Sequence, residues 1–291
     1  MNKSNKLMGW LFTTPAFLLF TGLTFIPLVM SIGYGLTKWN GISMPVFNGI
    51  QNYINLLKDS AYWKTFYNTM ALLAASLVFQ VFLALILAWL MCNATRGFRL
   101  YRSVFFLPVI VAPMAIGIMF SLFYNSEFGM INLLLDRIHL DGLKREWLSD
   151  PDIVLASVII PQVWQYIGLY VTIFVAAIRG IPDEAFESAR IDGANQWQVF
   201  WGIVTPMVRD IERICVVLAV TGSLKAFDHA WAITGGGPGN ASAYLAVYMY
   251  KSAFVKSGFG YASAISSTML LIAMILSFAA RKLIPSDEGV S

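Results

Sequence analysis

Six long apolar segments constrain this 291-residue chain more than any other feature. The first four contain no acidic or basic residue, and each of the six is near the ~20 residues that a helix needs to cross the hydrocarbon of a bilayer. Within lipid every backbone polar group must be paired, and barrel strands would be shorter and strictly alternating. We therefore predict an all-α membrane protein in one domain, 1–291, with six transmembrane helices over residues 10–33, 67–93, 103–124, 153–178, 211–232 and 261–282.

The composition supports a membrane protein and excludes several other classes. Only 12% of the residues are charged, whereas soluble domains carry about 25%. The two cysteines, Cys92 and Cys215, lie in or beside apolar runs and form neither a disulfide framework nor a metal-ligand set. The net charge of +4 is spread over short loops, which argues against nucleic acid as a partner. The first apolar run is too long for a signal peptide, so we expect a retained first span.

The short loops predict the orientation. Residues 93–102 carry Arg96, Arg99 and Arg102 and no acid, whereas residues 125–152 carry six acids against three bases. Because basic residues collect in cytoplasmic loops, we place 93–102 inside and 125–152 outside. Both termini and the polar stretch 179–206 are then cytoplasmic. We expect a multi-pass protein of the bacterial or archaeal plasma (inner) membrane.

The polar stretch 179–206 has the pattern of two short helices separated by a break. Pro182 followed by Asp183 and Glu184 predicts a helix start, Gly193 predicts its end, and a second amphipathic run precedes Pro206. By local pattern the stretch is either a docking surface for a partner or a pair of helices lying on the bilayer.

Catalytic and ion-coupling signatures are scarce. The serines of the sixth segment have no histidine at a plausible depth, and no metal-ligand motif occurs, so we expect no catalytic centre and no metal. Lys225 and Asp228 are three residues apart and could pair on one helix face. The glycine-rich TGGGPGN at 234–240 lacks the lysine that ends a nucleotide-binding loop and predicts a tight turn or close backbone approach.

The stretch 179–206 resembles the EAA loop of permease subunits in binding-protein-dependent ABC importers. Glu187-Ser188-Ala189 is followed after three residues by Gly193, and after nine more by Ile203 and Pro206. Ser188 and Thr205 depart from the usual alanine and leucine, while the spacing is kept. Residues 47–69 and 223–254 resemble the sugar-uptake branch, the second of them the F-type subunit of maltose transport.

This resemblance implies the type I (MetI-like) permease fold, with cytoplasmic coupling helices between spans four and five. It also implies four partners: a second homologous permease subunit, two cytoplasmic ATPase subunits that bind ATP and magnesium, and an extracytoplasmic solute-binding protein. This chain would itself hold no cofactor and would not be an enzyme. Ala185 and Ala189 are small and four apart, which suggests a surface that another chain can approach closely. The residues expected to couple to the ATPase are Glu184, Glu187, Ala189, Asp192, Gly193, Ile203 and Pro206.

A carbohydrate is the implied substrate, on a path formed by spans four, five and six. Sugars present apolar faces and a rim of hydroxyl groups, so aromatic rings beside amides and hydroxyls suit them. Gln162, Tyr166 and Tyr170 are each four residues apart and share one helix face. The alternative function is an ion-coupled secondary carrier or a channel that acts without an ATPase. The candidate pathway residues are Gln162, Trp164, Tyr166, Tyr170, Ser223, Lys225, Phe227, Asp228, Ser263, Ser266 and Ser267.

Overall fold

A computed structural model describes residues 3–94 and 97–283, so Arg96 of the orientation prediction lies outside the described residues. The chain forms two compact units, one of residues up to Ser60 with Met249–Leu270, the other of Ala61–Tyr248 with the residues from Leu271. In the described part, five helices are long and apolar enough to cross a membrane. A sixth crossing is counted if two helices joined by a sharp bend form one span.

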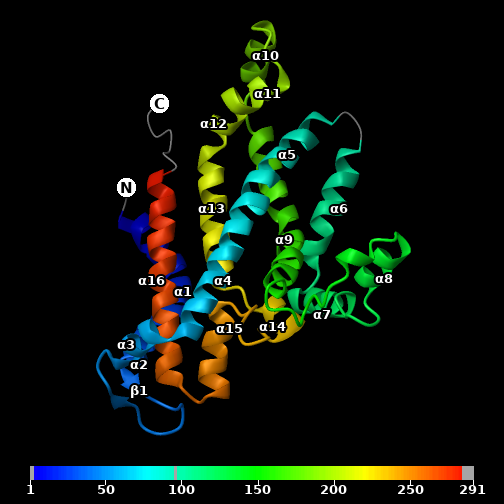
Figure 1. The fold of residues 1–291 in the computed structure, drawn as a ribbon. Coiled ribbons are helices and arrows are strands. Elements are labelled where there is room, and N and C mark those ends of the chain that lie inside the picture. Colours follow the sequence, from blue (N-terminus) through cyan, green and yellow to red (C-terminus); the bar gives the residue numbers. More distant parts are fainter. Residues whose placement is uncertain (1–2, 95–96, 284–291) are drawn as a thin grey trace. The chain divides into compact units, whose positions relative to one another are not determined.

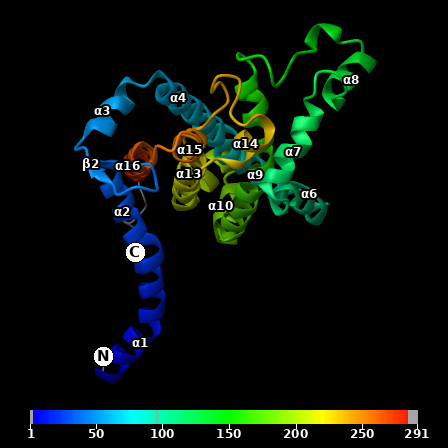
Figure 2. The ribbon, with the colours of Figure 1, turned by 90° about the horizontal axis from the view of Figure 1, so that it is seen from below.

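The first unit begins with a continuous apolar rod. α1 (Lys3–Phe20), the π-helical turn η1 (Thr21–Phe25) and α2 (Ile26–Gly35) follow one another without a break (Figure 2). Next come β1 (Thr37–Lys38) and β2 (Val46–Phe47), paired antiparallel, and α3 (Gln51–Lys58). The Asn52 amide donates to the carbonyl oxygens of Gly35 and Thr37, at 2.9 and 2.8 Å, and so ties α3 to the end of the rod.

The first unit also contains the turn before the last helix. α15 (Leu245–Tyr250), most of which belongs to the second unit, leads into η5 (Lys251–Val255) of the first unit, and α16 (Phe259–Leu283) begins in this unit. The Tyr261 hydroxyl donates to Asp59 Oδ2 at 2.6 Å. The Gly260 backbone N–H donates to the carbonyl of Trp39, and the Thr37 carbonyl lies where a side chain on Gly260 would stand. These contacts fix the start of α16 against the β1–β2 hairpin.

The second unit opens with a helix that changes its winding halfway along. α4 (Ser60–Ala75), η2 (Ser76–Phe82, π-helical) and α5 (Leu83–Asn93) form one long span. Its most buried residues recur every four positions, from Asn68–Thr69 to Ala88–Trp89. A regular helix has 3.6 residues per turn, so such a pattern would drift by about 40° at each step. The wider π turn, over Ser76–Phe82, takes up part of this drift.

The third predicted span is two helices rather than one. α6 (Phe98–Ile110) and α7 (Pro113–Phe123) meet at an angle of 93°. Pro113 disfavours helical backbone at the residue before it, and Ala112 is extended, with φ −59° and ψ 131°. The Gln165 amide donates to the carbonyl oxygens of Pro108 and Val111, at 3.2 and 2.8 Å, which satisfies groups that the break exposes. A continuous helix over 103–124 is therefore wrong.

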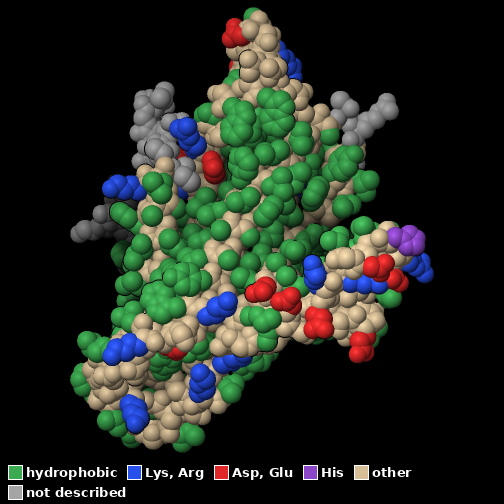
Figure 3. Space-filling model, viewed as in Figure 1, with side chains coloured by type: hydrophobic (Ala, Val, Ile, Leu, Met, Phe, Trp, Pro, Cys, Tyr) green, Lys and Arg blue, Asp and Glu red, His purple; other side chains and the backbone are tan. Residues whose placement is uncertain are grey.

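α9 (Val154–Arg179) is the centre of the second unit and packs against α5, α6 and α13 (Arg209–Leu224) (Figure 1). Gly168 lets the backbone of α6 approach closely, because a side chain there would meet the carbonyl of Phe105. The core between these helices includes Phe174, Val171 and Cys215. Apolar side chains cover the middle of the visible face of these helices in Figure 3.

The glycine-rich stretch after α14 (Asp228–Thr234) is a turn in which Gly236 is buried and Pro238 and Gly239 are exposed. Gly235, Gly236 and Gly239 all have positive φ, and a side chain on Gly236 would crowd that of Ala243. The loop therefore makes the tight turns and the close backbone approach that the glycines predict.

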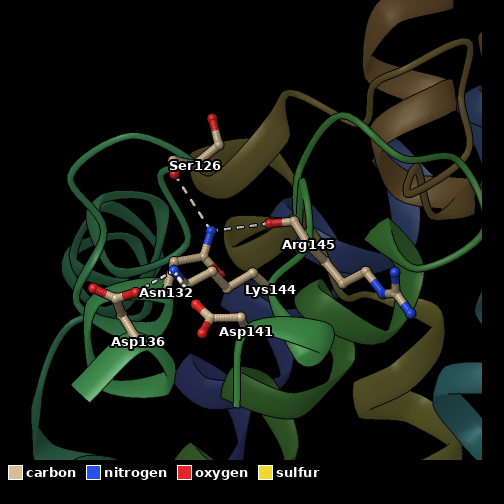
Figure 4. A network of polar contacts seen from close by, with 6 residues as sticks. All are labelled: Ser126, Asn132, Asp136, Asp141, Lys144 and Arg145. Atoms are coloured by element: carbon tan, nitrogen blue, oxygen red, sulfur yellow. Dashed lines mark hydrogen bonds and ion pairs between the residues drawn. The ribbon is translucent and has the colours of Figure 1, made fainter. Parts of the chain in front are cut away.

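Charged side chains gather at two ends of the second unit. One is the tip formed by α10 (Asp183–Ile191), and the other is the segment of α8 (Met130–Arg137) and η3 (Asp141–Leu143) (Figure 3). In the α8 segment Lys144 contacts Asp136 and Asp141, at 2.5 and 2.6 Å, and Asn132 donates to the Arg145 carbonyl (Figure 4). The hydrogen bond from Lys144 lowers the pKa of Asp136, and the same bond raises the pKa of Lys144.

Candidate functional site

A cavity of about 310 Å³ lies within the second unit, between three of its apolar helices. Its walls come from η2, from α9 and from the break between α13 and α14. Pockets for small molecules enclose about 300–1,000 Å³, so this one has room for a small polar group or part of a larger ligand.

Most of the predicted pathway residues line this cavity. Gln162, Tyr166 and Tyr170 follow one another at intervals of four on α9, so all three face it. The remaining predicted residues that line it come from the end of α13 and the start of α14, namely Ser223, Lys225, Phe227 and Asp228. The shared helix face predicted for α9 is confirmed, and a role in transport stays a prediction.

Trp164 and the serines of α16 are placed elsewhere. Trp164 is two residues from both Gln162 and Tyr166 and so lies on the far side of α9. Its ring packs edge-on against Phe120 at 5.8 Å between centroids, and 44% of its surface is exposed. Ser263, Ser266 and Ser267 belong to the first unit. Ser267 donates to the carbonyl of Ser263 within its own helix, at 2.8 Å.

Lys225 and Asp228 do not share a helix, so that part of the sequence prediction is wrong. α13 ends at Leu224, α14 begins at Asp228, and Phe227 between them has φ −136° and ψ −54°. The described residues show no ion pair between the two side chains. Because of the break, Lys225 and Asp228 line the cavity without pairing with each other, so each is available to a polar partner.

Three polar residues that line the cavity are not among the predicted pathway residues: Ser76 and Gln80 from η2, and His229 from α14. Ser76 Oγ and Ser223 Oγ are 3.4 Å apart. The sequence did contain a signal, because Asn68, Ser76 and Gln80 are polar residues separated by multiples of four within an otherwise apolar segment. Over the twelve residues from Asn68 to Gln80 a regular helix would drift by about 120°, so the spacing alone does not place all three on one face.

Two buried polar atoms of cavity-lining side chains have no hydrogen-bond partner among the described residues. They are Gln162 Oε1 and His229 Nε2. The His229 ring lies edge-on to Tyr166, with 6.1 Å between centroids. Buried polar groups are normally paired, so unpaired atoms beside aromatic rings suit a ligand that offers both hydroxyl groups and apolar faces.

The stretch 179–206 has the helix–break–helix structure that its sequence predicts. α10 begins directly after Pro182, and Gly193 has φ +73°. Asn195 then caps α11 (Gln196–Val199), since its side chain accepts from the backbone of Trp197 and Gln198. η4 (Phe200–Val204) and α12 (Thr205–Met207) complete the second arm.

The predicted coupling residues divide into two groups. Those on the free side of α10 are exposed, namely Glu184, Glu187, Asp192 and Gly193. Ile203 and Pro206 are half-buried, and Ile203 packs against the core of this chain.

The small-residue surface on α10 faces the chain itself. Ala189 is buried and Ala185 packs against the same core, so an approach surface for another chain at these two alanines is wrong. The apolar side chain of Ile191, at the end of α10, has 85% of its surface exposed.

Glu187 also borders a second cavity of about 580 Å³, between α10 and the ends of α5 and α9. Arg179 lines the same cavity, and its guanidinium lies 3.8 Å from the centre of the Phe98 ring. α10 is thus held close to α9 at its base and exposed at its tip (Figure 1).

Comparisons with known proteins agree on one family. The family model described as "Binding-protein-dependent transport system inner membrane component" matches residues 80–286. A probable ABC transporter permease protein of Bacillus subtilis (strain 168), YurN, is 38% identical over 280 residues, covering 95% of this chain and 96% of the relative. The probable starch degradation products transport system permease protein AmyD of Thermoanaerobacterium thermosulfurigenes is 30% identical, covering 94% and 92%.

One solved structure has a similar fold over almost the whole chain. It is a bacterial alginate ABC transporter in complex with an alginate pentasaccharide-bound periplasmic protein. A chain of that complex gives a TM-score of 0.83 at 19% identity, covering 99% of this chain and 98% of its own length. At this level of identity the likeness concerns the fold.

Proposed function

Because this chain belongs to the family of binding-protein-dependent transport system inner membrane components, we propose that it forms half of a saccharide pathway through the membrane. As a permease subunit of an ABC importer for carbohydrate uptake it is not an enzyme, and ATP hydrolysis belongs to a separate subunit. In the proposed arrangement the bent pair α6–α7 counts as one of six spans, and both termini and α10 are cytoplasmic.

The cavity of α9, η2 and the α13–α14 break is the observation that carries the saccharide assignment. It places amide, hydroxyl and imidazole groups beside the rings of Tyr166, Tyr170 and Phe227. Rings suit the apolar faces of a sugar, and the polar groups suit its hydroxyl rim. The name of AmyD, which concerns starch degradation products, supports the same substrate class.

We assign α10 and α11 to the contact with the ATPase. Glu187 on α10 and Asp192 directly after it are exposed, and Gly193 permits the turn into the second arm. Because α10 follows directly on α9 and α11–α12 lead directly into α13, a displacement of this tip moves the two helices that line the cavity. Closure of the ATPase subunits would rock these helices between outward- and inward-open states. The assembly would include a second permease, two ATPase subunits and an external solute-binding protein.

The alternative is an ion-coupled carrier, and one observation favours it. Lys225 and Asp228 line the cavity separately, and ionisable groups within a membrane commonly mark ion pathways. The two functions differ in their need for ATP and for partner subunits.

Co-purification with enzymatic readout separates these functions. We expect the chain to bring down an ATPase subunit and a second permease, with ATP hydrolysis raised by the loaded solute-binding protein. Glu187→Ala should reduce this stimulation severalfold, while Glu127→Ala, an exposed acid in the α8 segment, should not. An unchanged stimulation in Glu187→Ala would remove α10 from the contact. A chain that purifies alone and transports with an ion gradient would support the carrier instead.

A further inference from the structure

Span two contributes a wall to the cavity through its π-helical turn. Ser76 is the first residue of η2 and Gln80 is its fifth. Both are almost completely buried, with 3% and 4% of their surface exposed. They lie on the face that carries the four-residue burial pattern of this span. π-helical turns occur frequently at functional sites, because they redirect the side chains on one face.

Gln80 makes two long contacts with the backbone of α9. Its Nε2 lies 3.4 Å from the carbonyl oxygens of both Gln162 and Val163. If the amide were reversed, its oxygen would face two carbonyl oxygens and repel them, so the two contacts favour the present orientation. Oε1 makes no hydrogen bond with any described residue and is left as an acceptor on a side chain that lines the cavity.

Ser76 links the same wall to the opposite side of the cavity. Its hydroxyl lies 3.4 Å from that of Ser223, a long contact between span two and α13. Each hydroxyl can act as donor or acceptor, and a contact of this length is weak. A ligand hydroxyl can therefore replace it at little loss.

We propose that Gln80 and Ser76 on the π-helical turn of span two contact the transported saccharide and help to set its specificity. Gln80 Oε1 accepts a hydrogen bond from a sugar hydroxyl, and Ser76 exchanges its contact with Ser223 for a contact with the sugar. This inference rests on the proposed function, since it takes the cavity as the saccharide pathway. It adds span two to the walls formed by α9 and by the α13–α14 break.

Accessibility of introduced cysteines tests the placement without relying on transport. The chain has two cysteines, so Cys92→Ser with Cys215→Ala gives a cysteine-free background. In the assembled complex we expect Ser76→Cys and Gln80→Cys to react with the hydrophilic reagent 2-sulfonatoethyl methanethiosulfonate, in the resting or the vanadate-trapped state. Val78→Cys, two residues from both Ser76 and Gln80 and therefore on the opposite face of the helix, where 52% of its surface is exposed, should not react. If neither cavity position reacts in either state of a complex that hydrolyses ATP, the proposal fails.

Uptake selectivity tests the contact itself, and Gln165 provides a matched control. Gln165 is also a buried glutamine, and its side-chain amide also donates to two backbone carbonyl groups, but it does not line the cavity. With the solute-binding protein saturated by maltose, maltotriose or lactose in turn, Gln80→Leu should change the ratio of uptake rates by about two- to tenfold, the effect of one uncharged hydrogen bond. Gln165→Leu should change all rates by a common factor.

An unchanged ratio in Gln80→Leu, or an equal change of ratio in Gln165→Leu, would overturn the specificity role. A wild-type complex that imports none of a wider panel of saccharides would instead overturn the proposed function. The labelling result then still reports whether span two lines a polar cavity, so the two failures are distinguishable.

Discussion

Replacing Asn68 with aspartate should loosen the glycine-rich loop and destabilise the second unit. Asn68 is buried in α4, and its Nδ2 lies 3.1, 3.0 and 2.9 Å from the carbonyl oxygens of Asn240, Ala241 and Ala243. The amide thus serves three acceptors with two N–H groups. Aspartate has nearly the same shape but, when ionised, offers only acceptors, so it would face three carbonyl oxygens with no donor.

The magnitude follows from the hydrogen bonds that the substitution removes. Each hydrogen bond between uncharged groups contributes about 0.5–1.5 kcal/mol, and each buried polar group left unpaired costs about 1–3 kcal/mol. The removal of two donors, with at least one carbonyl left unpaired, lowers the free energy of unfolding by about 2–6 kcal/mol. For a chain of this size, that corresponds to a fall in Tm on the order of 10 °C.

Thermal unfolding of the purified protein in detergent measures the effect. Asn93→Asp is the matched control, because Asn93 is exposed and, among the described residues, its amide donates to the Trp89 carbonyl of its own helix, at 2.9 Å. The control should change Tm by a small fraction of the Asn68→Asp effect. If Asn68→Asp unfolds within roughly 2 °C of the wild type, the shift expected for less than one hydrogen bond, the loop is not anchored as described.

Three further predictions concern the packing of α9, the turn after α10 and the α8 segment. Gly168→Ala should cost about 1–3 kcal/mol in thermal unfolding through overpacking against α6, whereas Gly202→Ala, which meets nothing within 4 Å, should be tolerated. Gly193→Ala should cost about 1–2 kcal/mol because of its positive φ; an unchanged Tm would contradict the turn. In the α8 segment, the pKa of Asp136 is lowered, so the stability that this carboxylate contributes is present above the ordinary carboxyl pKa and is lost as pH falls through the folded-state pKa. The pKa of Lys144 is raised, so the stability that this amine contributes is present below the ordinary amine pKa and is lost as pH rises through the folded-state pKa. Hydrogen exchange of this segment, corrected for intrinsic rates, should therefore be slowest between these two pKa values. A Lys144→Gln variant with the same dependence of exchange on pH would contradict this prediction.

The sequence predicts well those features that depend on neighbours along one helix. The apolar segments indicate the spans, Pro182 and Gly193 mark the ends of the polar helix, and the spacing of Gln162, Tyr166 and Tyr170 identifies a shared face. Each of these depends on local backbone preference or on helical periodicity, and both are visible in the sequence.

The features that the sequence does not predict depend on contacts between helices. Hydropathy does not reveal the bend at 111–112, because α6 and α7 are both apolar. The carbonyl groups at the bend are satisfied by Gln165, which lies on another helix. The burial of Ala189 depends on a core built by α5 and α9. Ser76 and Gln80 lie on a π turn whose winding is not visible in the sequence, and the cavity that they line is completed by α9 and by the α13–α14 break.

The central claim is that this chain imports a saccharide only as part of an ATP-driven complex. Uptake of a radiolabelled saccharide into proteoliposomes that contain the assembled complex tests it most directly. We predict uptake that requires ATP on the α10 side of the membrane and the loaded solute-binding protein on the other, with neither sufficient alone. Uptake by this chain without ATPase subunits, driven by an ion gradient, would contradict the account.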